Sequence, residues 1–124
     1  MHEISSLIER LRQMRAEFAD RLQRIRHARH HLDGPVSQDF KEQVTEREND
    51  EVLERLEAAT VADLRQMDHA LERVRSGVYP QCEECGEPVE MERLHAMPFA
   101  TFCRVCVARR ESQQLLKRSA RMVA

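Results

Sequence analysis

The chain has 124 residues, of which 34% are charged and 4% are aromatic, and it contains no tryptophan. This composition is typical of long, solvent-exposed helices in one small domain rather than of a compact α/β core. With a formal charge of −2, nothing in the overall composition attracts the chain to nucleic acid.

The apolar runs are all shorter than the roughly 18–20 residues that a membrane span needs. The first residues also lack the basic leader and apolar stretch of a signal peptide. We therefore expect a cytoplasmic protein that does not contact membranes.

A long helix is predicted over residues 3–32. Its apolar residues recur in steps of three and four, as along the contact seam of a coiled coil. They are Ile4, Leu7, Leu11, Met14, Phe18, Leu22, Ile25, Ala28 and Leu32. Asp33, Gly34 and Pro35 are expected to end this helix.

A second helix is predicted over residues 39–76, with Gly77 at its C-terminal cap. Its seam is expected at Val52 or Leu53, Leu56, Ala59 or Thr60, Leu64, Met67, Leu71 and Val74. Residues 1–32 hold seven basic and four acidic residues, whereas residues 39–76 hold six basic and eleven acidic residues. Opposite net charges and a short connection predict an antiparallel helical hairpin over residues 1–77, with its tip at residues 33–42.

Residues 78–124 form the second predicted domain, a small four-cysteine zinc finger followed by a C-terminal helix over residues 104–122. Three prolines, at positions 80, 88 and 98, interrupt its first part. Short β-ribbons are expected at residues 89–91 and 99–102. The fold class is therefore mainly α, with a hairpin, a C4 zinc ribbon and a terminal helix.

Four cysteines form two C-x2-C pairs, Cys82 with Cys85 and Cys103 with Cys106. Two such turns supply four thiolates at the corners of a tetrahedron, the arrangement that Zn²⁺ prefers. Because cysteine would fill every position, no site is left for a substrate water, so we expect one structural zinc ion. Four unpaired thiols, two redox pairs and an iron–sulfur cluster are the alternatives; a thioredoxin-type redox pair would need a βαβ context that the pattern lacks.

The stretch from Gly77 to Val89, the segment Arg93–Ala100 and the second cysteine pair resemble the DksA/TraR family of bacterial transcription factors. The resemblance extends to residues 45–51 and, through the hairpin, to nearly the whole chain. It implies a protein that binds RNA polymerase, inserts its hairpin into the secondary channel and brings an acidic tip near the catalytic centre. It does not imply sequence-specific DNA binding, which we do not expect.

The resemblance places the tip motif at Asp39, Glu42 and Val44, where well-known members have D-x-x-D-x-A. Both acidic charges are kept, whereas Val44 is bulkier than the usual alanine. Asp39 followed by Glu42 also reads as a helix N-cap with its capping box, and the two roles are compatible. Members that bind ppGpp use basic residues where this chain has Gln66 and Met97, so we expect no ppGpp dependence.

No nucleophile–base set, phosphate loop or open metal site occurs, so we expect a regulator and not an enzyme. The alternative function is a small zinc-ribbon module that binds DNA or another protein through its basic C-terminal helix. We expect the chain to be a monomer.

Overall fold

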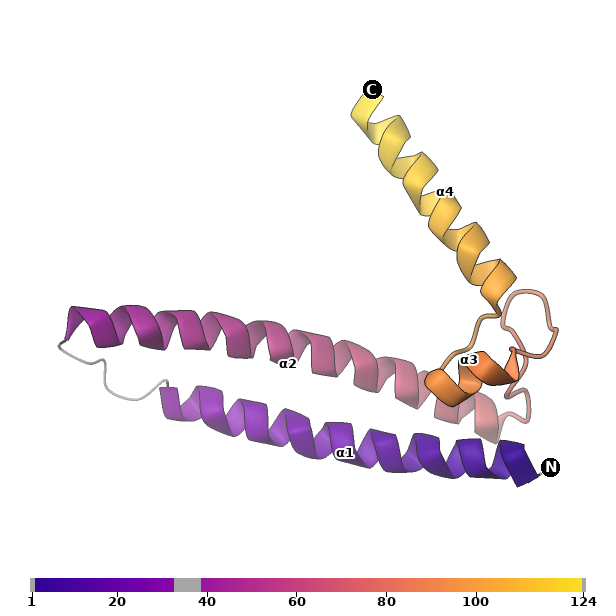
Figure 1. Ribbon diagram of the computed structural model, residues 1–124, viewed down its shortest axis with the longest axis horizontal. Coiled ribbons are helices and arrows are strands. Elements are labelled where there is room, and N and C mark those ends of the chain that lie inside the picture. The colour runs from indigo at the N-terminus through magenta and orange to yellow at the C-terminus, as the bar shows by residue number, and fades with distance from the viewer. Residues whose placement is uncertain (1, 33–38, 124) are drawn as a thin grey trace. The chain divides into compact units, whose positions relative to one another are not determined.

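The computed structural model of the chain describes residues 2–32 and 39–123. This part of the chain forms no strand and four helices, which are α1 (His2–Leu32), α2 (Phe40–Arg75), α3 (Met91–Ala96) and α4 (Arg104–Val123) (Figure 1). The predicted mainly α fold is thus confirmed. The chain divides into two compact units, one formed by Arg12–Asp68 and the other by Met1–Leu11 with His69–Ala124.

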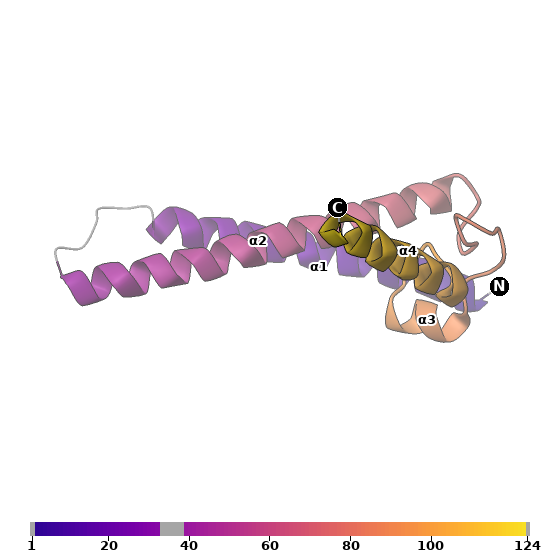
Figure 2. The ribbon, with the colours of Figure 1, turned by 90° about the horizontal axis from the view of Figure 1, so that it is seen from above.

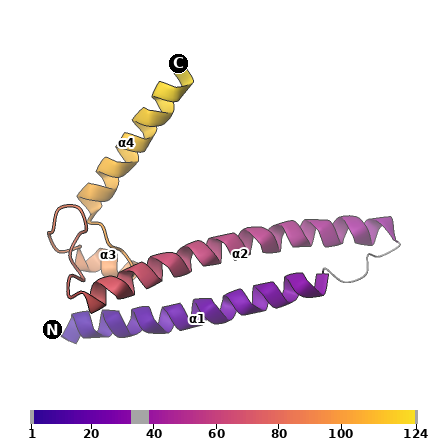
Figure 3. The same cartoon turned by 180° about the vertical axis from the view of Figure 1, so that it is seen from behind.

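The unit formed by Arg12–Asp68 is the larger part of the helical hairpin, in which α1 and α2 run antiparallel side by side (Figures 1 and 3). Its buried residues are Ile25, Thr60, Leu64 and Met67. On α1 the predicted seam is confirmed from Met14 to Ala28, since Met14, Phe18, Leu22 and Ala28 are at least partly buried. The side chain of Leu32 is not among those described. The end of the first helix at residues 33–35, and residues 33–38 of the predicted tip, lie outside the described residues.

One predicted seam position on α2 is wrong. Leu56 is 49% exposed, whereas Glu57 is only partly exposed. The steps of four and three that lead back from Leu64 through Thr60 reach residue 57 next, and an ionic side chain therefore takes the place where an apolar one was expected.

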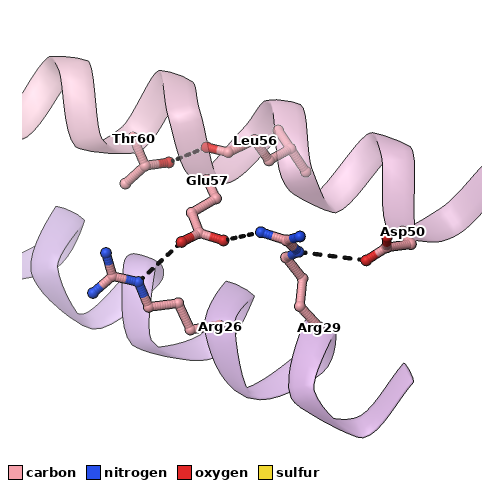
Figure 4. Close-up of polar contacts among 6 residues, drawn as sticks. All are labelled: Arg26, Arg29, Asp50, Leu56, Glu57 and Thr60. Atoms are coloured by element: carbon pink, nitrogen blue, oxygen red, sulfur yellow. Dashed lines mark hydrogen bonds and ion pairs between the residues drawn. The ribbon is translucent and has the colours of Figure 1, made fainter. Parts of the chain in front are cut away.

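Glu57 is held at that position by two arginines of α1 (Figure 4). Its Oε1 accepts a hydrogen bond of 3.1 Å from Arg26 Nε, and its Oε2 accepts one of 2.6 Å from Arg29 Nη1. Arg29 Nε also donates to Asp50 Oδ1 at 3.4 Å. The Thr60 hydroxyl next to this network donates to the Leu56 carbonyl at 2.7 Å. These contacts agree with the prediction that the oppositely charged helices face each other.

The other unit includes the C-terminal end of α2, which stops at a glycine cap. Gly77 has φ +75°, a conformation that L side chains rarely adopt. The Val78 N–H donates to the Arg73 carbonyl at 3.0 Å and the Gly77 N–H donates to the Val74 carbonyl at 3.1 Å, which is the bonding pattern of a Schellman motif. The predicted role of Gly77 is confirmed.

The expected β-ribbons do not form. The only β feature in the described residues is an isolated antiparallel bridge between Gln81 and Pro88. Helix α3 instead begins at Met91, the last residue of the first expected ribbon, and residues 99–102 form no strand. The reason is packing, because this short helix places Leu94 at 0% exposure in a core built around three of the cysteines.

Candidate zinc site

The four cysteines come from two local structures of the same unit. Cys82 and Cys85 belong to a tight turn that closes when the Gly86 N–H donates to the Cys82 carbonyl at 3.1 Å. Gly86 has φ +76°, which explains the glycine after the first pair. Cys103 directly precedes α4, and Cys106 lies in the first turn of that helix, where the helix dipole favours a thiolate.

The four sulfur atoms form one cluster. All of them lie within 4.8 Å of one another, and the Cys85 and Cys103 Sγ atoms are 3.7 Å apart. A tetrahedral zinc ion with Zn–S bonds of about 2.3 Å requires neighbouring sulfurs about 3.8 Å apart. The donor set therefore fits one Zn²⁺ ion, and the cluster is the only group of potential metal ligands of this kind in the described residues.

The protonation of these thiols shows why a cation suits them. Burial raises the pKa of the Cys82 thiol, but hydrogen bonds from backbone N–H groups, above all that of Cys103, outweigh burial and lower this pKa to about 6. The neighbouring Cys103 thiol, together with burial, raises the pKa of Cys106. Four thiolates this close repel one another, and a dication among them removes the conflict.

The two cysteine turns are tied together by the backbone. The Glu83 N–H of the first turn donates to the Thr101 carbonyl, two residues before Cys103, at 2.8 Å. Within the first turn, the Cys82 N–H donates to the Glu87 carbonyl at 2.7 Å. Tyr79 is buried in one cluster with three of the cysteines, and its hydroxyl donates to the Pro98 carbonyl at 2.8 Å. The site is thus held by its own hydrogen bonds as well as by any metal.

Two arginines brace the segment before Cys103. Arg93 Nε donates to the Phe102 carbonyl at 3.0 Å, and the Arg110 guanidinium lies 4.4 Å from the centre of the Phe102 ring. Both contacts fix the approach to the second cysteine pair.

A supporting residue that sequence reasoning missed is Glu90. Both of its carboxylate oxygens accept from the Arg104 N–H, at 3.1 and 3.2 Å. An acidic side chain at a helix N-terminus is stabilising, but this one comes from fourteen residues earlier in the sequence. No local sequence pattern could have revealed it.

The predicted tip residues lie in the unit formed by Arg12–Asp68. Asp39 caps α2, since its Oδ1 accepts a hydrogen bond of 2.9 Å from the Lys41 N–H. Glu42 is exposed in the first turn of the helix, and Val44 is 39% exposed. The capping role predicted for Asp39 is confirmed.

No described helix combines the length and the apolar character that crossing a membrane requires.

Comparison with known proteins gives two family matches that together cover most of the chain. Residues 8–74 match the family described as DnaK suppressor protein-like, N-terminal domain. Residues 76–112 match the prokaryotic dksA/traR C4-type zinc finger.

Among solved structures, transcription factor DksA2 from Pseudomonas aeruginosa aligns with a TM-score of 0.81 and 27% identity, over 92% of this chain and 87% of that protein. A DnaK suppressor protein from Agrobacterium tumefaciens aligns with a TM-score of 0.56 and 34% identity, over 85% of this chain and 91% of that one.

Among curated sequences, an RNA polymerase-binding transcription factor DksA from Caulobacter vibrioides is 40% identical over 55 residues. An uncharacterized protein from Aquifex aeolicus is 40% identical over 57 residues. The matched stretches are 44% and 46% of this chain, and they span 39% of the length of each of these relatives.

Proposed function

The chain belongs to the DksA/TraR family, and from this premise we propose that it is a non-enzymatic regulator of bacterial transcription that binds RNA polymerase. The observation that carries the proposal is the order of its parts, a helical hairpin followed by a C4 zinc finger, which match the two domains of the family in turn. The relative from Caulobacter vibrioides is named for binding RNA polymerase.

The hairpin is the part that enters the secondary channel of the polymerase. Its acidic end acts near the active centre through Asp39 and Glu42, with Val44 beside them. The N-cap supports this role, because a hydrogen bond from the Lys41 N–H orients the Asp39 carboxylate at the start of α2. An oriented charge at a helix end is better suited to act on a neighbouring site than one on a loose chain.

The zinc ion is structural and is held by the thiolates of Cys82, Cys85, Cys103 and Cys106. Bound there, it supplies cross-links between the first cysteine turn and the start of α4. Since cysteine fills all four positions, no water or substrate reaches the metal. This ligand set supports a regulator over a zinc hydrolase.

The test compares the wild-type chain with the double variant Asp39→Asn/Glu42→Gln. Asparagine is as good an N-cap as aspartate, so α2 keeps its start while both charges are lost. The zinc-loaded proteins are added to core RNA polymerase, and binding and the lifetime of promoter complexes are measured. We expect the variant to bind the polymerase and to lose most of its effect on promoter complexes.

The matched control is Glu51→Gln/Glu54→Gln, which removes the same charge from exposed positions of the same helix. It should behave as the wild type. If the wild-type chain neither binds core polymerase nor changes transcription, the proposed function is wrong. If the control loses as much activity as the tip variant, the assignment to the tip is wrong.

A second candidate function is binding of duplex DNA through α4. It is favoured by the exposure of Arg109, Lys117, Arg118 and Arg121 along that helix. A gel shift of the isolated zinc-loaded chain at physiological salt separates the two. Tight, sequence-selective binding would favour this second candidate, because the primary proposal requires none.

A further inference from the structure

Helix α4 leaves the zinc finger and then stands alone within its unit. Every described side chain from Ala108 to Met122 is exposed. Figures 1 and 3 show no other helix of the unit alongside it, and Figure 2 shows the same helix from above. Even so, it carries four large apolar residues, Val105, Leu115, Leu116 and Met122, which are 63% to 89% exposed. A helix of this kind exposes apolar surface that a partner could bury.

Three of these four apolar residues, Val105, Leu115 and Met122, lie on one stripe with coiled-coil spacing. Steps of three and four connect one stripe along the helix, and a strict alternation of these steps is the spacing of a and d positions in heptads. The six positions are Val105, Ala108, Ser112, Leu115, Ser119 and Met122. Arg110, Lys117 and Arg121 lie on the opposite side of the helix. The stripe is therefore suited to packing against another helix.

The surface beside the stripe is hollowed. A shallow pocket is lined by Glu111, Gln114, Leu115 and Arg118. Leu115 of the stripe forms one side of this hollow. The hollow separates two side chains of opposite charge, Glu111 and Arg118.

We propose that α4 pairs antiparallel with α4 of a second copy of the chain, in a two-fold symmetric dimer. In this register each residue of the stripe lies opposite another residue of the stripe on the second copy. Val105 lies opposite Met122 of the second copy, and Ser112 lies opposite Leu115 of the second copy. Ala108 and Ser119 form the remaining layer, whose small side chains let the two helices approach closely.

The charges that flank the stripe select this partner and this direction. Antiparallel pairing brings Glu111 opposite Arg118 of the second copy, and the symmetry repeats the same pair at the other end. Arg109 lies beside Leu116 of the second copy, where its methylene groups can cover the leucine. Parallel pairing would instead bring Arg104 opposite Arg109 and would create no pair of opposite charges.

The dimer should be weak, because the seam spans only three heptads and half of its positions hold alanine or serine. The sequence alone led us to expect a monomer, and the exposure of the stripe in the structure changes that expectation. The inference does not depend on the proposed function, since its test measures association of the purified chain alone.

The first experiment is sedimentation equilibrium of the full-length, zinc-loaded chain over a range of concentrations. We expect the average mass to rise from 14.6 kDa towards twice that value, with a dissociation constant on the order of 10 µM. A mass that stays at that of the monomer up to about 1 mM would overturn the proposal.

The second experiment tests the register by charge reversal. Glu111→Arg or Arg118→Glu alone turns both interchain pairs into repulsions, and we expect each to weaken dimerisation about tenfold. The double variant Glu111→Arg/Arg118→Glu restores opposite charges and should dimerise as the wild type does. Because residues 111 and 118 are two turns apart on one helix, the rescue cannot come from a contact within a chain.

The matched control is Lys117→Glu, which makes the same change of charge as Arg118→Glu at a position facing away from the seam. This variant should dimerise with a dissociation constant within about threefold of the wild-type value. The antiparallel pairing would be refuted if the double variant did not recover wild-type dimerisation. It would also be refuted if Lys117→Glu weakened dimerisation as much as Arg118→Glu does. Far-ultraviolet circular dichroism of each variant checks that α4 stays helical.

Discussion

Replacing Leu94 by alanine should destabilise the zinc-finger unit strongly. The side chain is 0% exposed and belongs to the core formed with Tyr79 and three of the cysteines. The change removes three carbon atoms, and at about 0.8 kcal/mol for each buried CH₂ group the lost transfer free energy is about 2.4 kcal/mol. The cavity left behind adds to this value, so we expect a loss of about 3 kcal/mol in the free energy of unfolding.

The assay uses the fluorescence of Tyr79, which is the only tyrosine in a chain without tryptophan. Because Tyr79 packs in the same cluster as Leu94, its emission during urea unfolding reports on this unit. Measurements on the zinc-loaded chain at low protein concentration give the midpoint and slope of the transition, and hence the free energy of unfolding.

The matched control is Leu116→Ala, which makes the same chemical change on a helix at a residue that is 70% exposed. It should alter the free energy of unfolding by no more than about 0.5 kcal/mol. If Leu94→Ala costs less than about 1 kcal/mol, or no more than the control, the packing assigned to α3 is wrong.

Three further predictions concern the metal, acid and nucleotides. The variant Cys82→Ser should bind less zinc by elemental analysis, while circular dichroism shows most of the hairpin helicity retained. The hydrogen-bonded Arg29 guanidinium holds the pKa of Glu57 below its ordinary 4.5. The stability that this carboxylate adds is therefore present above that ordinary value and is lost as the pH falls through the lowered pKa. Glu57→Gln should thus reduce the acid sensitivity of hairpin helicity, whereas Glu54→Gln should not. Finally, ppGpp should change the proposed effect on transcription less than about twofold. The family members that bind ppGpp have basic residues at the positions of Gln66 and Met97, and neither of these two side chains can pair with its phosphates.

The long helices could be predicted from the sequence because their signals are local. Heptad spacing and the Gly77 cap gave residues 3–32 and 39–76, and the structure has His2–Leu32 and Phe40–Arg75. The error at Leu56 has a physical cause. Hydrophobicity favoured a leucine in the seam, but the arginines of α1 stabilise Glu57 there instead, and that contact spans 28 to 31 residues of sequence.

The zinc site was predictable for a different reason, since two C-x2-C pairs show the donor atoms directly. The structure of the residues around the zinc site could not be predicted in this way. Helix α3 has only six residues, too few for a helical periodicity to reveal it. What decides its conformation is the burial of Leu94 and the Arg93 contact with the Phe102 carbonyl. Both involve residues that only the folded chain brings together.

The ionic contacts of Glu57 with Arg26 and Arg29 also fix the alignment of the two hairpin helices. An apolar seam can slide by a whole heptad and still bury its side chains, but such a slip would separate Glu57 from both arginines. One heptad is about 10.5 Å along a helix, and the slip would carry Asp39 the same distance along α1. A polar seam position sacrifices some stability to choose one register. In this hairpin, that choice determines where the acidic end of α2 stands.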